Sequence, residues 1–208
     1  MKKIITISRE FGSGGRELGK RMADLLGFAY IDREIISEIA EQYELSESYV
    51  ADTLAKKKVA MPLHYGRTLS LGSDAWKTEV NIIAAEQQLL KKAAEVQNCV
   101  IIGRNSEFVL KDMDPFSIFV YADMPSKLQR CREHASNDEF MDDEILKKKI
   151  LQVGHTRAKR HNYVSGLKWG RKENYRLCID TSGCDIKQLA RIAAGYADGW
   201  FRAREKRL

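Results

Sequence analysis

The amino end of the chain contains a strand pattern, a glycine cluster and a helix pattern in immediate succession. Residues 3–8 form a short apolar run rich in β-branched side chains, which is typical of a buried parallel strand. From Arg16 onward, leucine and methionine recur at helical spacing until Gly27, where a glycine is expected to end the helix. A strand that turns through glycines into a helix predicts an α/β fold built on a parallel sheet.

Further apolar runs repeat this pattern along the chain. Helical patterns lie between these runs, which cover residues 28–32, 99–102, 117–121 and 177–180. The stretch 33–95 is mostly helical in pattern, with an expected loop at residues 59–74. We therefore predict a three-layer α/β sandwich, in which a five-stranded parallel sheet has helices on both faces. Ligands of such sheets bind at the carboxyl ends of the strands, where charged and small residues collect here.

Length and composition restrict the class of protein. With 208 residues the chain can bury one core, so we expect a single domain, residues 1–208. No apolar run is long enough to cross a bilayer and the first residues lead directly into a strand pattern, so we expect a cytoplasmic protein without membrane contact. The formal net charge of +6 indicates an anionic partner. We find no zinc-finger or RNA-binding aromatic pattern, so we expect nucleotides rather than nucleic acid.

The glycine cluster is the first candidate site. Where a strand turns into a helix, consecutive backbone N–H groups and the positive end of the helix dipole converge on a phosphate, and a Cβ would hinder its approach. We assign phosphate binding to the residues that span this turn, namely Gly12, Ser13, Gly14, Gly15, Arg16 and Glu17. The alternative is a glycine-rich turn that binds no ligand.

The cluster departs from the phosphate-loop pattern G-x-x-x-x-G-K-[ST]. When Gly15, Arg16 and Glu17 are placed on its last three positions, arginine replaces the lysine and glutamate replaces the hydroxyl that holds magnesium. An arginine can neutralise a β- or γ-phosphate, although its planar guanidinium is not equivalent to a compact ammonium. A glutamate can give an oxygen ligand to Mg²⁺. We therefore predict Arg16 as a catalytic residue and Glu17 as a metal ligand.

Several segments, in order along nearly the whole chain, resemble the cytidylate kinase-like proteins. The most specific is ITISREFGSGGRE at residues 5–17, followed by LGFAYID at 26–32. The later segments are IIGR at 101–104, YAD at 121–123, and GLKWG at 166–170 with Asn174 and Tyr175. The resemblance implies a nucleoside monophosphate kinase of the P-loop kinase type, which uses ATP and Mg²⁺.

The resemblance also implies three parts within the one domain. The core, residues 1–32, 96–125 and 175–208, holds ATP, a helical insertion at 33–95 holds the nucleoside monophosphate, and a basic lid at 126–174 closes over both. By position, the resemblance places the base of ATP near Arg130. It places the acceptor near Asp32, Arg33, Gly103, Arg104 and Asn105. Asn105 stands where aspartate is usual, and Arg33 where a small residue is usual, so the acceptor need not be CMP.

The lid carries further candidate catalytic residues. Phosphoryl transfer requires two anions to be aligned and the charge of the transferring group to be stabilised, which arginines can do. Arg157 matches a lid arginine of the family, and Arg160 lies on roughly the same face if this segment is helical. A solvated basic helix is the alternative.

These observations lead to a functional hypothesis with one competitor. We predict transfer of the γ-phosphoryl group of ATP to CMP or a similar small phosphate acceptor. The alternative is a non-catalytic nucleotide-binding protein, a sensor or a partner-binding module, because the loop lacks the lysine. The expected partners are small-molecule nucleotides, and the apolar helix pattern at residues 76–95 allows a homodimer.

Overall fold

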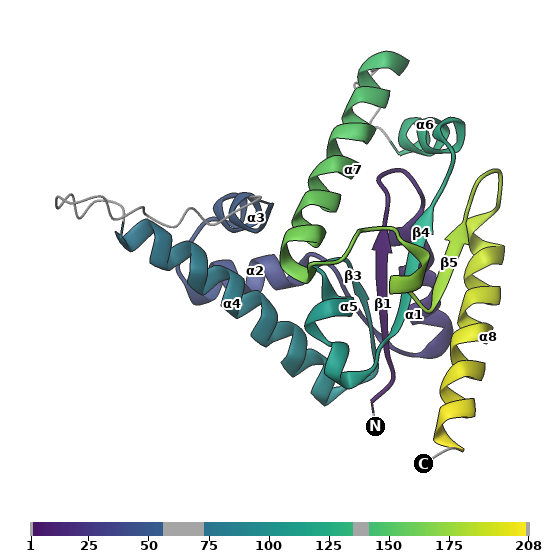
Figure 1. Cartoon of the computed structure of the whole chain (residues 1–208), viewed down its shortest axis with the longest axis horizontal. Coiled ribbons are helices and arrows are strands. Elements are labelled where there is room, and N and C mark those ends of the chain that lie inside the picture. Colours follow the sequence, from purple (N-terminus) through teal and green to yellow (C-terminus); the bar gives the residue numbers. More distant parts are fainter. Residues whose placement is uncertain (1, 56–72, 135–141, 207–208) are drawn as a thin grey trace.

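The computed structural model describes residues 2–55, 73–134 and 142–206. Their strands form one parallel sheet with the order β2-β3-β1-β4-β5, as Figure 1 shows. The strands are β1 (Ile4–Arg9), β2 (Ala29–Ile31), β3 (Cys99–Ile102), β4 (Phe116–Tyr121) and β5 (Leu177–Asp180). The predicted five-stranded parallel sheet is confirmed, with every strand end within one residue of its expected position.

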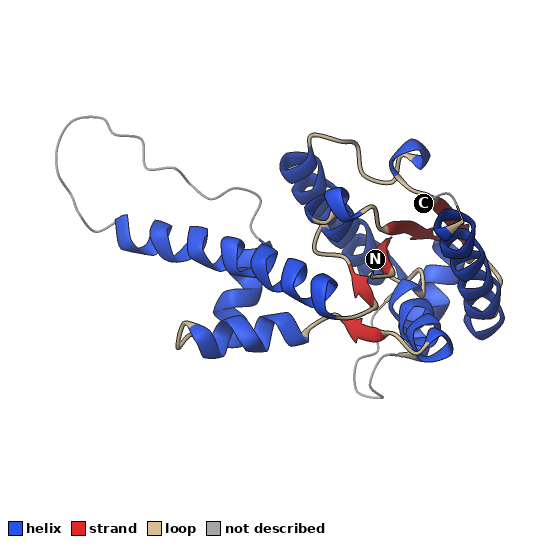
Figure 2. Cartoon of the chain, turned by 90° about the horizontal axis from the view of Figure 1, so that it is seen from below, coloured by secondary structure: helices blue, strands red, loops and turns tan. Residues whose placement is uncertain are grey.

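Helices cover both faces of the sheet, which confirms the three-layer sandwich. One face carries α1 (Gly15–Leu26) and α8 (Ile186–Glu205). The other carries α2 (Glu34–Gln42), α3 (Glu47–Ala55), α4 (Ser73–Val96) and α5 (Ser106–Val109), and α2 to α4 extend to one side of the sheet (Figure 2). Two short 3₁₀ helices are η1 (Lys111–Met113) and η2 (Lys172–Asn174).

Two helices, α6 (Met124–Glu133) and α7 (Asp143–Ser165), come from the predicted basic lid and stand beyond the carboxyl ends of the strands (Figure 1). The predicted loop at residues 59–74 lies outside the described residues except for its last two. Ser73 and Asp74 begin α4, so the loop prediction is wrong for these two residues. In the described part of the chain, no helix is both long enough and apolar enough to cross a membrane.

Alternating side chains of the strands build two cores. Ile5 and Ile7 of β1 pack against α1 and α8, whereas Ile4 points to the opposite face. On β3, Val100 and Ile102 belong to the core beneath α1 and α8, while Cys99 and Ile101 belong to the core beneath α2 to α5. Because both faces of the central strands are covered, all side chains of β1 and β3 except Arg9 are buried, and most of them are apolar.

The strand order places the end of β1 at the centre of the carboxyl-end rim. β1 pairs with β3 on one side and β4 on the other, and the Gly103 N–H donates to Ile7 O at 2.9 Å. The chain turns from Arg9 through the glycine cluster into α1, which ends as predicted at Gly27 in the left-handed conformation (φ 66°). The glycine cluster therefore lies where ligands of open α/β sheets bind.

Candidate phosphate-binding site

The glycine loop presents an uncapped helix end. Gly12 and Gly14 have positive φ angles of 77° and 73°, which favour glycine. Gly14 is the N-cap of α1 and makes no side-chain cap hydrogen bond. No described residue accepts a hydrogen bond from the amides of Gly15, Arg16 or Glu17 in the first turn of α1. These N–H groups and the helix dipole form an anion-binding arrangement.

Packing from outside the loop fixes its shape. A Cβ built on Gly14 would lie 2.6 Å from Ile186 Cδ1, and one built on Gly12 would lie 3.0 Å from Lys127 Cβ. Ser13 is buried, and its hydroxyl donates to Glu10 O at 2.9 Å. Its carbonyl accepts from Thr181 Oγ1 at 2.8 Å. The Ser13 side chain thus holds the loop from within, and the loop amides are pre-organised.

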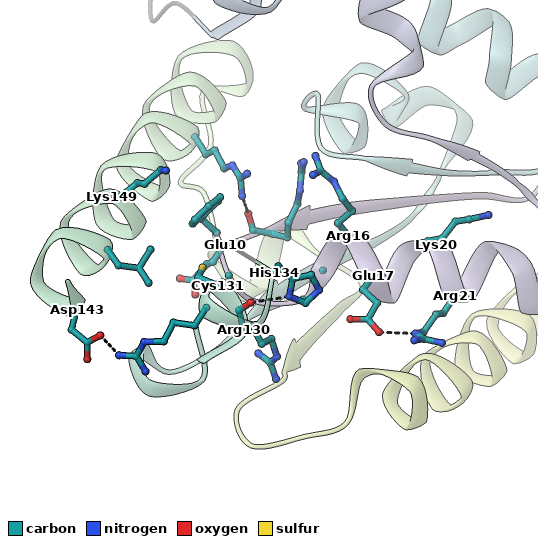
Figure 3. A pocket seen from close by; sticks show the side chains of 18 of the residues that line it. Glu10, Arg16, Glu17, Lys20, Arg21, Arg130, Cys131, His134, Asp143 and Lys149 are labelled. Carbon is teal, nitrogen blue, oxygen red and sulfur yellow. Dashed lines mark hydrogen bonds and ion pairs between the residues drawn. The ribbon is translucent and has the colours of Figure 1, made fainter. Parts of the chain in front are cut away.

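A cleft of about 1300 Å³ opens in front of the loop (Figure 3). The loop, α1, α6 and α7 supply its walls. Eight arginine and lysine side chains line it against five carboxylates. These basic residues are Arg9, Arg16, Lys20, Arg21, Arg130, Arg132, Lys149 and Arg157. An excess of positive charge at an open helix end suits a polyanion such as a nucleotide polyphosphate.

Arg16 and Asp32, both predicted site residues, form an ion pair. Arg16 Nε lies 2.5 Å from Asp32 Oδ2, and Arg9 Nη2 lies 3.9 Å from Asp32 Oδ1. Asp32 is 6% exposed, whereas the Arg16 side chain is 51% exposed. The buried carboxylate at the end of β2 therefore acts as a counter-ion for two arginines of the cleft.

Arg9 lines the cleft, although its sequence pattern alone did not make it a candidate. Its side chain is only 15% exposed. Burial, followed by the charge of Arg157, lowers the pKa of Arg9 to about 9, while Asp32 acts in the opposite direction. The signal in the sequence is its position, since Arg9 ends the first strand on the ligand-binding rim.

Helix α7 brings the predicted lid residue Arg157 to the loop. Its Nη1 donates to Arg9 O at 3.0 Å, and its guanidinium lies over the Phe11 ring, 5.8 Å from the ring centroid. Burial, with a further contribution from Arg16, lowers the pKa of Arg157 to about 10. A cation that is partly desolvated and close to other cations is prepared to bind an anion.

Arg104 and Arg160 share one buried carboxylate. Arg104 Nη1 lies 3.1 Å from Glu86 Oε1, and Arg160 Nη2 lies 2.7 Å from Glu86 Oε2. Glu86, on α4, is 2% exposed and was missed, since it looks like an ordinary glutamate in a helix pattern. The structure thus brings two predicted arginines together, one after β3 and one on α7, outside the lining of the cleft.

The other predicted acceptor residues lie around this group. Gly103 has a positive φ of 70°, and a Cβ built on it would overlap the Arg9 guanidinium. Asn105 caps α5 with φ 51° and makes no side-chain cap hydrogen bond. Arg33 is exposed at the start of α2, and no ion pair of its side chain is found among the described residues.

Arg130 and Glu17 already have protein partners. Arg130 lines the cleft, and its guanidinium donates to Thr181 Oγ1 at 3.1 Å, to Thr181 O, and to Cys184 O at 3.3 Å. Glu17 Oε1 accepts from Arg21 Nε at 2.8 Å, as the dashed line in Figure 3 shows. Across residues 2–55, 73–134 and 142–206, no three His, Cys, Asp or Glu side chains form a metal-binding group. Because Arg21 takes Oε1, the other carboxylate oxygen of Glu17, Oε2, is its candidate ligand atom for Mg²⁺ at the ATP phosphates.

Comparison with solved structures identifies the fold. A protein from Eubacterium ventriosum ATCC 27560, described as uncharacterized, is 23% identical with a TM-score of 0.69, covering 95% of this chain and 99% of that one. A shikimate kinase from Bacteroides thetaiotaomicron is 16% identical with a TM-score of 0.56, and the similarity covers 94% of this chain and 98% of that one. A gluconokinase from Sinorhizobium meliloti 1021 is 13% identical with a TM-score of 0.53, and the similarity covers 99% of this chain and 97% of that one. These similarities establish the fold of P-loop kinases.

Comparison with models of protein families identifies the family of this chain. A search of curated proteins gives no match. The family model described as the cytidylate kinase-like family matches residues 4–183, which include the glycine loop, Arg104 and α7. Fold and family together support a phosphotransferase of the kinase class. The chain belongs to the cytidylate kinase-like family.

Proposed function

We propose that the protein transfers the γ-phosphoryl group of ATP to the phosphate of a small acceptor, with CMP and other nucleoside monophosphates as the first candidates. The observation that carries this proposal is the uncapped amino end of α1, which faces a cleft with an excess of basic side chains. Membership of a kinase-like family supports the same reaction class.

In this reaction an oxygen of the acceptor phosphate attacks the γ-phosphorus. The bond from the γ-phosphorus to the oxygen that bridges it to the β-phosphate breaks, and ADP leaves with that oxygen. The loop amides hold the polyphosphate, while Arg9, Arg16 and Arg157 offset the charge of the transferring group. Mg²⁺ on the ATP phosphates would add further charge neutralisation, with Glu17 as its candidate protein ligand.

Arg104 and Arg160 are the candidates for the acceptor side. Glu86 fixes both guanidinium groups, and each arginine has further N–H donors beyond those it gives to this carboxylate. A phosphate dianion next to this pair would meet two cations with one counter-ion between them. We assign Arg104 and Arg160 to the acceptor phosphate, with Asp32, Arg33 and Asn105 as candidates for the rest of the acceptor.

The non-catalytic alternative has support of its own. The two loop residues that replace the lysine and the hydroxyl of the common pattern are both paired, Arg16 with Asp32 and Glu17 with Arg21. A loop in this state can bind phosphates through its amides without aligning them for transfer. A binding protein of this kind would bind ATP but release no ADP.

A panel of acceptors separates these two functions. We expect ADP release with CMP or another nucleoside monophosphate in the presence of ATP and Mg²⁺, and none with shikimate or gluconate, which carry no phosphate. Calorimetric titration with ATP runs in parallel. ATP binding without acceptor-dependent ADP release would favour the non-catalytic alternative, and absence of ATP binding would contradict both functions.

A further inference from the structure

The Arg9 side chain fills the space that a side chain at position 15 would need. A Cβ built on Gly15 would lie 2.6 Å from Arg9 Cβ, closer than real side chains approach, and 3.1 Å from Arg9 Cγ, a tight contact. The Arg9 side chain therefore begins where a side chain at Gly15 would begin. It then continues toward Gly103, where its guanidinium excludes any Cβ.

The position where α1 begins relates this overlap to the phosphate-loop pattern. In the pattern G-x-x-x-x-G-K, the lysine follows the last glycine and reaches the β- and γ-phosphates. Helix α1 begins at Gly15, with Gly14 as its left-handed N-cap. When Gly14 is taken as the last glycine, Gly15 stands at the lysine position and Arg9 at the first glycine position. The cation and the glycine of the common pattern have then exchanged places.

The surroundings of Arg9 are those expected of a cation that binds an anionic ligand. Its side chain is largely buried, and its one carboxylate neighbour among the described residues, Asp32, lies 3.9 Å away and is paired more closely with Arg16. Arg157 approaches from α7 and donates to the Arg9 carbonyl. A buried cation with a distant counter-ion next to further cations is unfavourable in the free protein, and a bound anion relieves this cost.

We propose that Arg9, rather than Arg16, takes the place of the phosphate-loop lysine and binds the terminal phosphates of the nucleotide. The inference rests on the proposed function, because it concerns the phosphates of the same cleft. In this arrangement Arg16 lies outside the lysine position, at the surface, and holds Asp32. The exchange explains how the loop can bind a polyphosphate although no lysine follows its glycines.

The first test compares three arginine variants in their affinity for inorganic pyrophosphate, measured by calorimetry. We expect Arg9→Met to weaken binding about 10- to 100-fold, since it removes charge-assisted hydrogen bonds in a desolvated site. Arg16→Met removes a half-exposed cation and should cost about fivefold at most. Arg202→Met, on the exposed face of α8, is the matched control and should bind as the wild type does. The melting temperature of the ligand-free Arg9→Met variant should not fall below that of the wild type.

The second test restores the common pattern. Gly15→Lys alone should abolish tight pyrophosphate binding, because its side chain collides with Arg9, and Arg9→Gly alone should weaken binding as Arg9→Met does. The double variant Arg9→Gly/Gly15→Lys removes both Arg9 contacts, leaves Val120 Cβ at 3.2 Å as the nearest atom to the new Cβ, and returns a cation to the site. Binding should therefore recover to within about fivefold of the wild type. A merely structural role of Arg9 predicts no such recovery.

Two outcomes would overturn the inference. One is an Arg9→Met variant that binds pyrophosphate as tightly as the wild type. The other is a double variant that binds no better than Arg9→Gly alone, which also decides the matter if Arg9→Met does not fold. Pyrophosphate binding requires neither an acceptor nor turnover. An inactive protein in which Arg9 controls pyrophosphate affinity would therefore contradict the proposed function and leave this inference standing.

Discussion

An Arg157→Met variant is expected to lose about 10²- to 10³-fold in kcat while keeping its affinity for ATP within about threefold of the wild type. Arg157 reaches the loop from α7, and the protein offers it the Arg9 carbonyl and the Phe11 ring but no close carboxylate among the described residues. Its charge therefore has most effect when negative charge develops on the transferring phosphoryl group. Initial rates of ADP release with the best acceptor of the panel give kcat.

Lys159→Met is the matched control for this prediction. Lys159 lies on the same helix, is exposed, and has no ion pair in the described part of the chain. Its loss should leave kcat unchanged, which separates the position of Arg157 from the overall charge of α7. A kcat for Arg157→Met close to that of Lys159→Met would contradict the catalytic role of Arg157.

A Glu86→Gln variant is expected to lose about 3 kcal/mol of unfolding free energy, because Arg104 and Arg160 would keep their charges without the buried carboxylate between them. For a chain of this length, such a loss lowers the melting temperature by about 6–12 °C. Denaturant unfolding gives the free energy, and differential scanning calorimetry gives the melting temperature. A phosphate-containing acceptor should partly restore the stability, since it would supply the missing negative charge.

Glu95→Gln, on the exposed side of the same helix α4, is the matched control and should change the unfolding free energy by less than about 0.5 kcal/mol. Equal stability of the two variants would show that Glu86 is not the counter-ion on which both arginines depend. The assignment of Arg104 and Arg160 to the acceptor phosphate would then lose its structural basis.

The sequence predicted the sheet well because local pattern and burial agree there. Each strand is a short, mainly apolar run, and Ile4, Ile5 and Ile7 of β1 show how side chains on both faces of such a strand become apolar and buried. The end of α1 at Gly27 is likewise a local feature. The order of the strands was not predicted, because it depends on contacts between residues far apart in the chain.

The site was predicted only in part, for a related reason. The loop, Arg16 and Arg157 were proposed because each belongs to a motif or a family position, and the structure places all three around one cleft, while their functional roles stay predictions. Arg9 and Glu86 were missed, because a charged residue after a strand and a glutamate within a helix are ordinary in sequence. Their meaning comes from burial and from partners 18 to 148 positions away, such as Arg104 and Arg157. The division into core, insertion and lid, the cytoplasmic location and the homodimer stay predictions.

A crystal structure with Mg²⁺ and a non-hydrolysable ATP analogue tests the central claim most directly. We expect the amides of Gly14 to Glu17 to donate to the β- and γ-phosphates at hydrogen-bond distance, with Arg9 against the terminal phosphate. A polyphosphate bound elsewhere, with the first turn of α1 free of any anion, would contradict the phosphate-binding role of the loop and the proposals that follow from it.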